Sequence, residues 1–173
     1  LQDGPLFIAD PFVNVNPSED QLVVLTQHCL EFIRKFGIEP KVALLSHSNF
    51  GTYDDEGAHK MKIAAERLRD SNPDLQIEGE MHALSAFNEQ LRSSIFKNNR
   101  LTGRANLLIM PNMDAASIAL GLSRSITNAI MIGPYLNGLD NAAHILIPSV
   151  SARGIFNMAA LTVEDAIRKR VNT

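Results

Sequence analysis

Four side chains that can form hydrogen bonds lie close together after an apolar run at 42–45: Ser46, Ser48, Asn49 and Thr52. In an open α/β sheet, ligands bind where strands end and helices begin, so these groups are candidate contacts for a small molecule. Gly51 lies among them and lets the backbone approach a ligand closely. A purely structural interpretation stays open, because serine and asparagine also close turns and cap helices.

A second loop repeats this pattern after the apolar run 106–110. Asn112, Asp114 and Ser117 are its candidate ligand contacts. Acidic residues at 54–56 crowd the start of the helix that follows the first loop. They favour the helix dipole but oppose a phosphate at that helix end.

Other kinds of site find no support in the residue spacing. The five histidines have no second histidine, cysteine or carboxylate at a dependable metal spacing, so no metal site is predicted. Ser46 and His47 are adjacent, and adjacent residues of an extended segment point to opposite sides rather than forming a nucleophile–base pair. The chain contains no Gly-x-Ser-x-Gly elbow, dinucleotide-binding glycine motif or Walker loop.

Composition indicates an ordinary globular protein of 173 residues, with 45% hydrophobic and 20% charged residues. A formal net charge of −3 gives no electrostatic case for nucleic acid or an anionic membrane as a partner. No apolar segment is long enough to span a bilayer, and the single Cys29 fits a reducing cytoplasm. Because the chain begins at Leu1 rather than methionine, we expect it to be a piece of a longer protein.

Alternating strand and helix patterns predict an α/β fold with a mostly parallel sheet covered by helices on both faces. Period-2 and period-3.6 patterns place strands at 6–9, 41–45, 75–81, 106–110 and 144–147, and helices at 18–36, 55–71, 84–95, 115–125 and from Ser149 or Ser151 onward. The strand at 75–81 alternates apolar and polar residues, which predicts one exposed face. The predicted inward faces are Met61, Ala64, Ala65 and Leu68 in one helix and Ile155, Met158, Ala159, Thr162, Ala166 and Ile167 in the last.

Several separated segments, taken in order, resemble the phosphate acetyltransferase (phosphotransacetylase) family. They are residues 7–11, 16–19, 37–48, 74–80, 105–114 and 133–139. Ser-His-Ser-Asn-Phe-Gly at 46–51, Glu-Met-His-Ala at 80–83 and His-Ile-Leu-Ile-Pro-Ser at 144–149 most resemble the phosphotransacetylase-like domain at the C-terminus of large NADP-dependent malic enzymes. The resemblance implies the phosphotransacetylase fold, which is like that of isocitrate and isopropylmalate dehydrogenases, and makes residues 1–173 the second half of such a domain.

The chain departs from active transacetylases where the resemblance places their catalytic residues. Active members carry Asn-Asp-Leu-Ser-Arg and an aspartate six residues beyond the arginine. Here the serine, arginine and aspartate positions hold Ile147, Pro148 and Gly154, so no catalytic residue is predicted. Thiol attack needs a base, and the developing negative charge needs a hydrogen-bond donor; these side chains supply neither. A one-residue shift would bring Ser149 or Arg153 nearer without restoring the spaced trio.

Three functions follow from the resemblance. In the first, the domain binds acetyl-CoA or a related acyl-CoA as an allosteric effector and joins subunits into a homo-oligomer, a dimer of this domain. NADP and Mg or Mn would then serve malate decarboxylation in a preceding part of the parent enzyme. In the second, the domain is an active phosphate acetyltransferase. In the third, it is a structural dimerisation module without a ligand.

Overall fold

The structure is a computed structural model that describes residues 4–127, 130–148 and 150–171. The chain forms two compact units, Leu1–Thr127 and Asn128–Thr173. Among the described residues, the first unit holds the sheet and five helices, and the second holds the last helix.

Four parallel strands form the sheet of the first unit: β1 Phe7–Ile8, β2 Lys41–Leu45, β3 Gln76–Met81 and β4 Leu107–Ile109. Their order across the sheet is β1-β4-β2-β3, so β4 is inserted between two strands that precede it in sequence. Val42 aligns with Ile77 on one side and with Leu107 on the other. The carboxyl ends of all four strands therefore meet at one edge, which is the edge where ligands bind in such folds.

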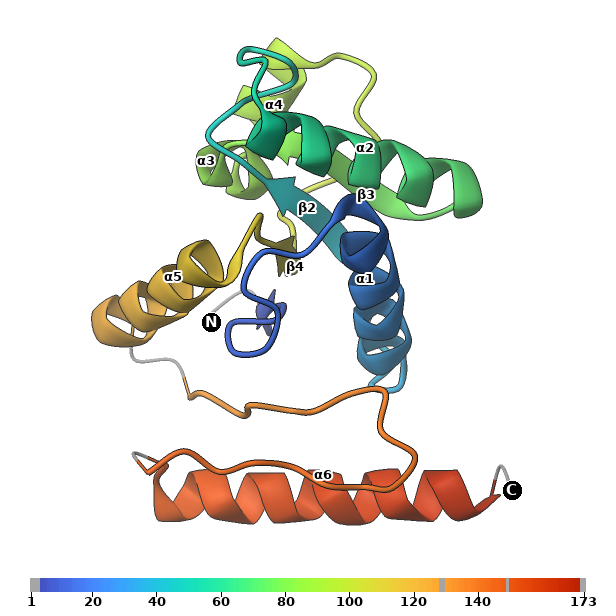
Figure 1. The fold of residues 1–173 in the computed structure, drawn as a ribbon, viewed down its shortest axis with the longest axis vertical. Coiled ribbons are helices and arrows are strands. Elements are labelled where there is room, and N and C mark those ends of the chain that lie inside the picture. Colours follow the sequence, from blue (N-terminus) through green and yellow to red (C-terminus); the bar gives the residue numbers. More distant parts are fainter. Residues whose placement is uncertain (1–3, 128–129, 149, 172–173) are drawn as a thin grey trace. The chain divides into compact units, whose positions relative to one another are not determined.

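The capping signals predicted at Ser18, near Asp55 and at Ser151 agree with the structure, whereas the helix predicted to begin at 115 begins at Met113, capped by Asn112. The helices are α1 Glu19–Arg34, α2 Glu56–Ser71, α3 Ala83–Phe87, α4 Glu89–Ile95 and α5 Met113–Ile126 in the first unit and α6 Ala152–Val171 in the second (Figure 1). Ser18 and Gln21 form a reciprocal capping box at the start of α1. Asp55 and Asn112 accept hydrogen bonds from the first backbone N–H groups of α2 and α5.

Apolar layers cover both faces of the sheet. Val42 and Leu44 point into a cluster with α1 and α2, whereas Ala43 and Leu45 point into a cluster with Ala86 of α3 and Ala116 of α5. Successive residues of β2 thus alternate between two buried layers, as expected of a central parallel strand. The predicted inward face of α2 is confirmed, since its members Met61, Ala64, Ala65 and Leu68 are all buried.

The prediction that one face of β3 is exposed is wrong. Glu78 and Glu80 are as buried as the apolar residues between which they alternate. Glu78 accepts hydrogen bonds from the Arg100 backbone N–H at 2.7 Å and from Arg69 at 3.2 Å. Donors from neighbouring segments thus satisfy carboxylates that a sequence pattern assigns to solvent. Burial raises the pKa of Glu78, and these donors oppose that shift.

The single helix predicted at 84–95 is two short helices, α3 and α4. Asn88 separates them because it has extended backbone geometry and caps α4 by accepting from the Leu91 N–H. Arg92 of α4 is fully buried and holds this region together. Its guanidinium donates to the carbonyl oxygens of Ser85, Leu101 and Gly103 at 2.6–2.9 Å.

In the second unit, the strand predicted at 144–147 is wrong, since this segment has no regular structure. Ile145 and Leu146 are exposed, and strand geometry needs a partner strand for its backbone groups. The inward face predicted for α6 is only partly right, because Met158 is buried whereas Ile155 and Ile167 are exposed.

The segment before α6 is fastened to that helix by polar contacts. The Tyr135 hydroxyl donates to the buried Asp165 carboxylate, and Lys169 pairs with the same carboxylate at 3.1 Å. Burial, together with this acceptor, raises the pKa of Tyr135 to about 12. The backbone N–H of Leu136 donates to Nδ1 of His144, whose ring packs against Tyr135.

Candidate functional site

The β2–α2 loop folds onto the end of β3 through a buried carboxylate. Oε1 of Glu80 accepts hydrogen bonds from the Ser48 hydroxyl at 2.8 Å and the Gly51 backbone N–H at 2.6 Å. Ser48 in turn accepts from the Tyr53 N–H at 3.2 Å. The conformation of the loop is therefore set from within the protein, before any ligand binds.

Other predicted contacts in this loop also have internal partners. The Asn49 amide oxygen accepts from the His82 N–H at 3.1 Å and the Ser85 hydroxyl at 3.2 Å. The Ser46 hydroxyl oxygen accepts from the Ser48 N–H, and that of Thr52 accepts from the Asn49 N–H. Ser48 and Asn49 are buried, whereas Thr52 is exposed and Ser46 half-buried.

The β4–α5 loop lies at the same edge of the sheet, because β4 is the neighbour of β2. Asn112 is half-buried and caps α5 by accepting from the Ala115 N–H at 2.9 Å, while Asp114 and Ser117 are exposed on the first turns of that helix. Lys60 of α2 joins the β4–α5 loop to the loop between β1 and α1, since its ammonium donates to the Pro111 carbonyl and to Asn16 Oδ1, both at 2.8 Å. Burial lowers the pKa of Lys60, and the nearby Glu56 and Glu19 oppose that shift.

The N-terminus of α2 already holds a carboxylate of the protein. Asp55 accepts from the Gly57 and Ala58 N–H groups at 2.9 and 3.1 Å and pairs with His47 at 2.7 Å. The Ala58 N–H is the main cause that lowers the pKa of Asp55, with His47 contributing. A phosphate at this helix end would compete with the Asp55 carboxylate for the same donors.

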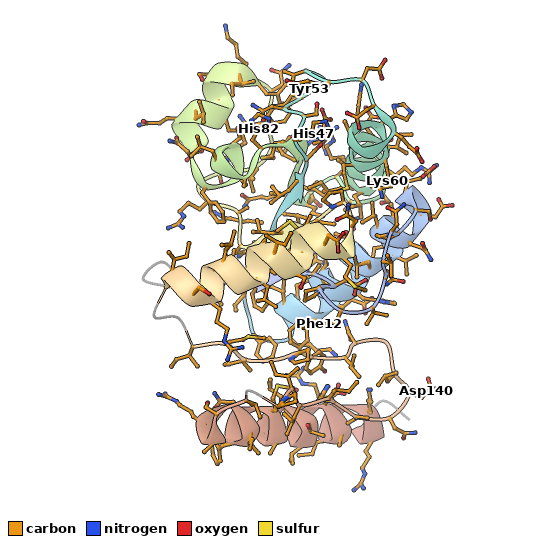
Figure 2. The ribbon with its side chains drawn as sticks, turned by 60° about the vertical axis from the view of Figure 1, so that its left-hand side comes forward. Phe12, His47, Tyr53, Lys60, His82 and Asp140 are labelled. Atoms are coloured by element: carbon orange, nitrogen blue, oxygen red, sulfur yellow. The ribbon has the colours of Figure 1, made fainter. Side chains whose placement is uncertain are left out.

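Aromatic and imidazole side chains gather on the outer surface of the β2–α2 loop. Figure 2 shows His47, Tyr53 and His82 near one another, with Lys60 on the adjoining helix. His82 Nε2 lies 2.7 Å from the His47 carbonyl oxygen, and the rings of His47 and Tyr53 are 5.3 Å apart. These side chains can stack on a planar group or form hydrogen bonds with it.

A cavity of about 310 Å³ opens beside this loop. Its lining combines the buried Glu80 with charged, aromatic and imidazole groups of the loop and of α2. The lining residues are Gly51, Tyr53, Asp54, Ala58, His59, Lys62 and Glu80. The cavity therefore offers a hydrogen-bond acceptor, a cation and an aromatic ring within one small space.

Ile147, Pro148 and Gly154, which the resemblance aligns with the family's catalytic trio, lie in the second unit. Gly154 is buried in the first turn of α6, and its N–H donates to the Ser151 hydroxyl oxygen at 3.1 Å, which places the helix cap at Ser151. A Cβ atom at position 154 would lie 2.7 Å from Val150 Cγ2, so a side chain there requires Val150 to move. Ile147 is half-buried, Pro148 and Arg153 are exposed, and Ser149 falls outside the described residues.

The residues of the cavity were not predicted as site residues. Glu80 lies in the motif 80–83 that carries part of the resemblance, but the alternation in β3 indicated that its side chain is exposed to solvent and did not indicate that it anchors a loop. The signal that could have identified Glu80 is its place at the carboxyl end of a strand next to β2.

Two further observations concern the described residues alone. They include no set of three or more histidine, cysteine or acidic side chains arranged to hold a metal ion. None of their helices combines the length and the apolar character needed to cross a membrane.

Burial, with a contribution from Asp10, raises the pKa of Cys29 to about 12, so this thiol stays protonated at neutral pH.

Known proteins are similar to nearly the whole chain. An NAD-dependent malic enzyme of Rhizobium meliloti and an NADP-dependent malic enzyme of Salmonella typhimurium are each 46% identical, over 95% and 96% of this chain. A phosphate acetyltransferase of Clostridium acetobutylicum is 33% identical over 96% of it. The chain spans only 21–22% of the length of these malic enzymes and 50% of that acetyltransferase.

Solved structures agree with these sequence relationships. A phosphotransacetylase from Streptococcus pyogenes superposes with a TM-score of 0.85 at 28% identity, over 92% of this chain and 49% of its own. A phosphotransacetylase from Staphylococcus aureus superposes with a TM-score of 0.80 at 22% identity, over 91% of this chain and 48% of its own, and supports the fold. The family described as phosphate acetyl/butaryl transferase matches residues 1–163. The α/β chain therefore belongs to the phosphate acetyl/butaryl transferase family.

Proposed function

We propose that this chain is a regulatory domain of a malic enzyme, that it binds acetyl-CoA or a related acyl-CoA, and that it does not transfer the acyl group. The proposal rests on the three positions that the resemblance aligns with the family's catalytic serine, arginine and aspartate, in a chain that belongs to that family. Ile147, Pro148 and Gly154 offer no side-chain proton donor or acceptor. Removing thiol attack while keeping the fold leaves ligand binding as the function that the domain can still perform.

Sequence similarity supports the malic enzyme context. Two malic enzymes are 46% identical to the chain over the 165 and 167 residues that align, against 33% over 168 residues for the phosphate acetyltransferase of Clostridium acetobutylicum. In such a parent protein, the nicotinamide cofactor and the divalent metal would belong to other residues.

The loops at the carboxyl edge of the sheet support binding of a coenzyme. Internal hydrogen bonds preorganise the β2–α2 loop, so a ligand need not order it. Thr52, Asp114 and Ser117 are exposed, and Asn112 of the β4–α5 loop is half-buried. Ser46, Ser48 and Asn49 would act chiefly by shaping the loop, since each already has a partner inside the protein.

Titration calorimetry of the full-length protein with acetyl-CoA, together with malate turnover, tests the proposal. We expect saturable heat and a change in malate turnover at the same acetyl-CoA concentrations, because an allosteric ligand binds two states with different affinities. Absence of both signals would contradict the proposal. Phosphate-dependent release of CoA thiol from acetyl-CoA would instead establish the active transferase.

A second candidate function is assembly of two copies, favoured by apolar residues on the surface of α5. Ile118, Leu122 and Ile126 recur every fourth residue and are all more than half exposed. A stripe of this kind suits a helix–helix contact. Leu122→Glu should convert a dimer to a monomer in sedimentation experiments, and the exposed Ser117→Glu serves as the control for added charge. A dimer that survives Leu122→Glu would contradict assembly through α5.

A further inference from the structure

We infer that the cavity beside the β2–α2 loop is the subsite for the phosphorylated ribose at the nucleotide end of the coenzyme, an inference that rests on the proposed function. The cavity of about 310 Å³ is large enough for a sugar phosphate and too small for a whole coenzyme. Its lining contains an acceptor and a cation, Glu80 and Lys62.

The state of the Glu80 carboxylate is the first step of the argument. Only 2% of this residue is exposed, yet it lines the cavity. Oε1 accepts both hydrogen bonds from the loop, and Oε2 has no partner among the residues that the structure describes. Among the described residues, Nε2 of His144 is the one buried side-chain atom without a partner, so Oε2 of Glu80 is reached by solvent in the cavity and can accept a hydrogen bond from a molecule there.

The second step is the match between the lining and one part of the ligand. The ribose of coenzyme A carries a free 2′-hydroxyl next to a 3′-phosphate, which places a donor beside an anion. A carboxylate commonly accepts from a ribose hydroxyl, and an ammonium pairs with a phosphate. Glu80 and Lys62 supply these two groups, while the exposed ring of Tyr53 offers a surface on which a purine can stack.

One member of the lining opposes the ligand. The exposed Asp54 carboxylate would repel the 3′-phosphate, so its neutralisation should strengthen binding rather than weaken it. This expectation separates the subsite from a merely structural cluster, in which removal of a surface charge has no effect on affinity.

Calorimetry of the full-length protein with acetyl-CoA and with its analogue lacking the 3′-phosphate tests the inference. Glu80→Gln retains an oxygen for Ser48 and Gly51 and replaces the acceptor Oε2 with an NH₂ donor; it should weaken acetyl-CoA binding about tenfold. Lys62→Gln should weaken binding about threefold and make the two ligands bind alike, while Asp54→Asn should strengthen binding of acetyl-CoA alone. Glu31→Gln on α1 and Lys97→Gln after α4 are exposed controls that should match the unchanged protein.

The outcomes separate this inference from the function on which it rests. If acetyl-CoA binds the unchanged protein and the Glu80, Lys62 and Asp54 variants equally, the coenzyme binds elsewhere and the subsite is wrong, while the proposed function stands. If the unchanged protein binds neither ligand, the proposed function fails and the inference fails with it. Unfolding curves of Glu80→Gln must coincide with those of Glu31→Gln, and if they do not, the inference is judged on Lys62→Gln and Asp54→Asn.

Discussion

The Ser48 hydroxyl donates to Oε1 of Glu80 across 2.8 Å, and this buried pair fastens the β2–α2 loop to the end of β3. Ser48→Ala would leave the Tyr53 N–H without its acceptor and remove one of the two donors to Glu80. We expect the free energy of unfolding to fall by about 2 kcal/mol, as for a buried polar group that loses its partner. Urea unfolding of Ser48→Ala beside the exposed Ser117→Ala measures the difference, and equal midpoints would contradict it.

Gly79 offers a test of how closely β2 and β3 approach. A Cβ atom at this position would lie 2.7 Å from the Leu44 Cβ atom and 2.8 Å from its carbonyl oxygen. Gly79→Ala should therefore destabilise the protein by about 2–3 kcal/mol, as overpacking of a core does. Gly121 in α5 is the control, because apart from its chain neighbours and the nearby backbone of its own helix no atom lies within 4 Å of its Cβ position. Gly121→Ala should raise stability by about 0.5–1 kcal/mol, the helix-propensity difference between the two residues.

Thermal unfolding of the two alanine variants decides between these expectations. Opposite shifts of the midpoint would confirm the close contact at Gly79. A midpoint for Gly79→Ala at or above that of the unchanged protein would contradict it, because β2 and β3 could then move apart without a loss of stability.

Arg92 predicts a larger effect, because one guanidinium satisfies several backbone groups. Arg92→Met would bury the carbonyl oxygens of Ser85, Leu101 and Gly103 without this donor. We expect a loss of about 3 kcal/mol or more in the free energy of unfolding. Arg92→Lys should recover only part of it, since an ammonium cannot reproduce the planar geometry of a guanidinium. Lys97→Met, an exposed change of similar chemistry, should leave the denaturation midpoint unchanged.

The sheet and most helices were predictable because their signals are local. Apolar runs at 42–45 and 106–110 are sufficient to place β2 and β4, and Ser18 and Asp55 mark the starts of α1 and α2, whereas the cap of α5 at Asn112 lies before the start predicted at 115. The role of Glu80 was not predictable, because its partners Ser48 and Gly51 are about thirty residues distant in sequence. An alternating pattern predicts which side chains share a face, and it cannot predict which loop will later cover that face.

The segment at 144–147 shows the converse limit. Its apolar residues have the composition of a strand, yet a strand forms only where a neighbouring strand accepts and donates its backbone hydrogen bonds. Composition alone does not contain that information. The candidate contacts Ser46, Ser48 and Asn49 show the same limit, since both interpretations offered by the sequence use the same residue types and only their partners differ.

His144 predicts how the second unit responds to acid. Burial lowers its pKa below the ordinary value of 6.5, the nearby Asp165 opposes this shift and Lys169 adds to it. Nδ1 accepts from the Leu136 N–H, so it must be unprotonated, as in the neutral ring. As pH falls below about 6.5 the unfolded chain binds a proton that the folded ring resists, so stability present above that pH is progressively lost.

Hydrogen exchange of the Leu136 amide measures this response. After correction for intrinsic exchange, its protection should be lower at pH 5.5 than at pH 7.5. His144→Gln can accept the same hydrogen bond without titrating, and it should remove the difference between the two pH values. Equal protection at both pH values in the unchanged protein would exclude His144 as the responsive group.

Gly154 predicts that acyl transfer cannot be restored by returning the family's side chains. A Cβ atom there would lie 2.7 Å from Val150 Cγ2, so an aspartate has no room while Val150 keeps its position. Ile147→Ser, Pro148→Arg and Gly154→Asp combined should therefore leave phosphate-dependent CoA thiol release at background. Packing is tested separately: Gly154→Ala should destabilise the protein, whereas it should stabilise a Val150→Ala background by up to about 1 kcal/mol. Thiol release above background in the triple variant would contradict this prediction. It would show that the fold has room for the three side chains and that this chain lacks acyl transfer only because they are missing.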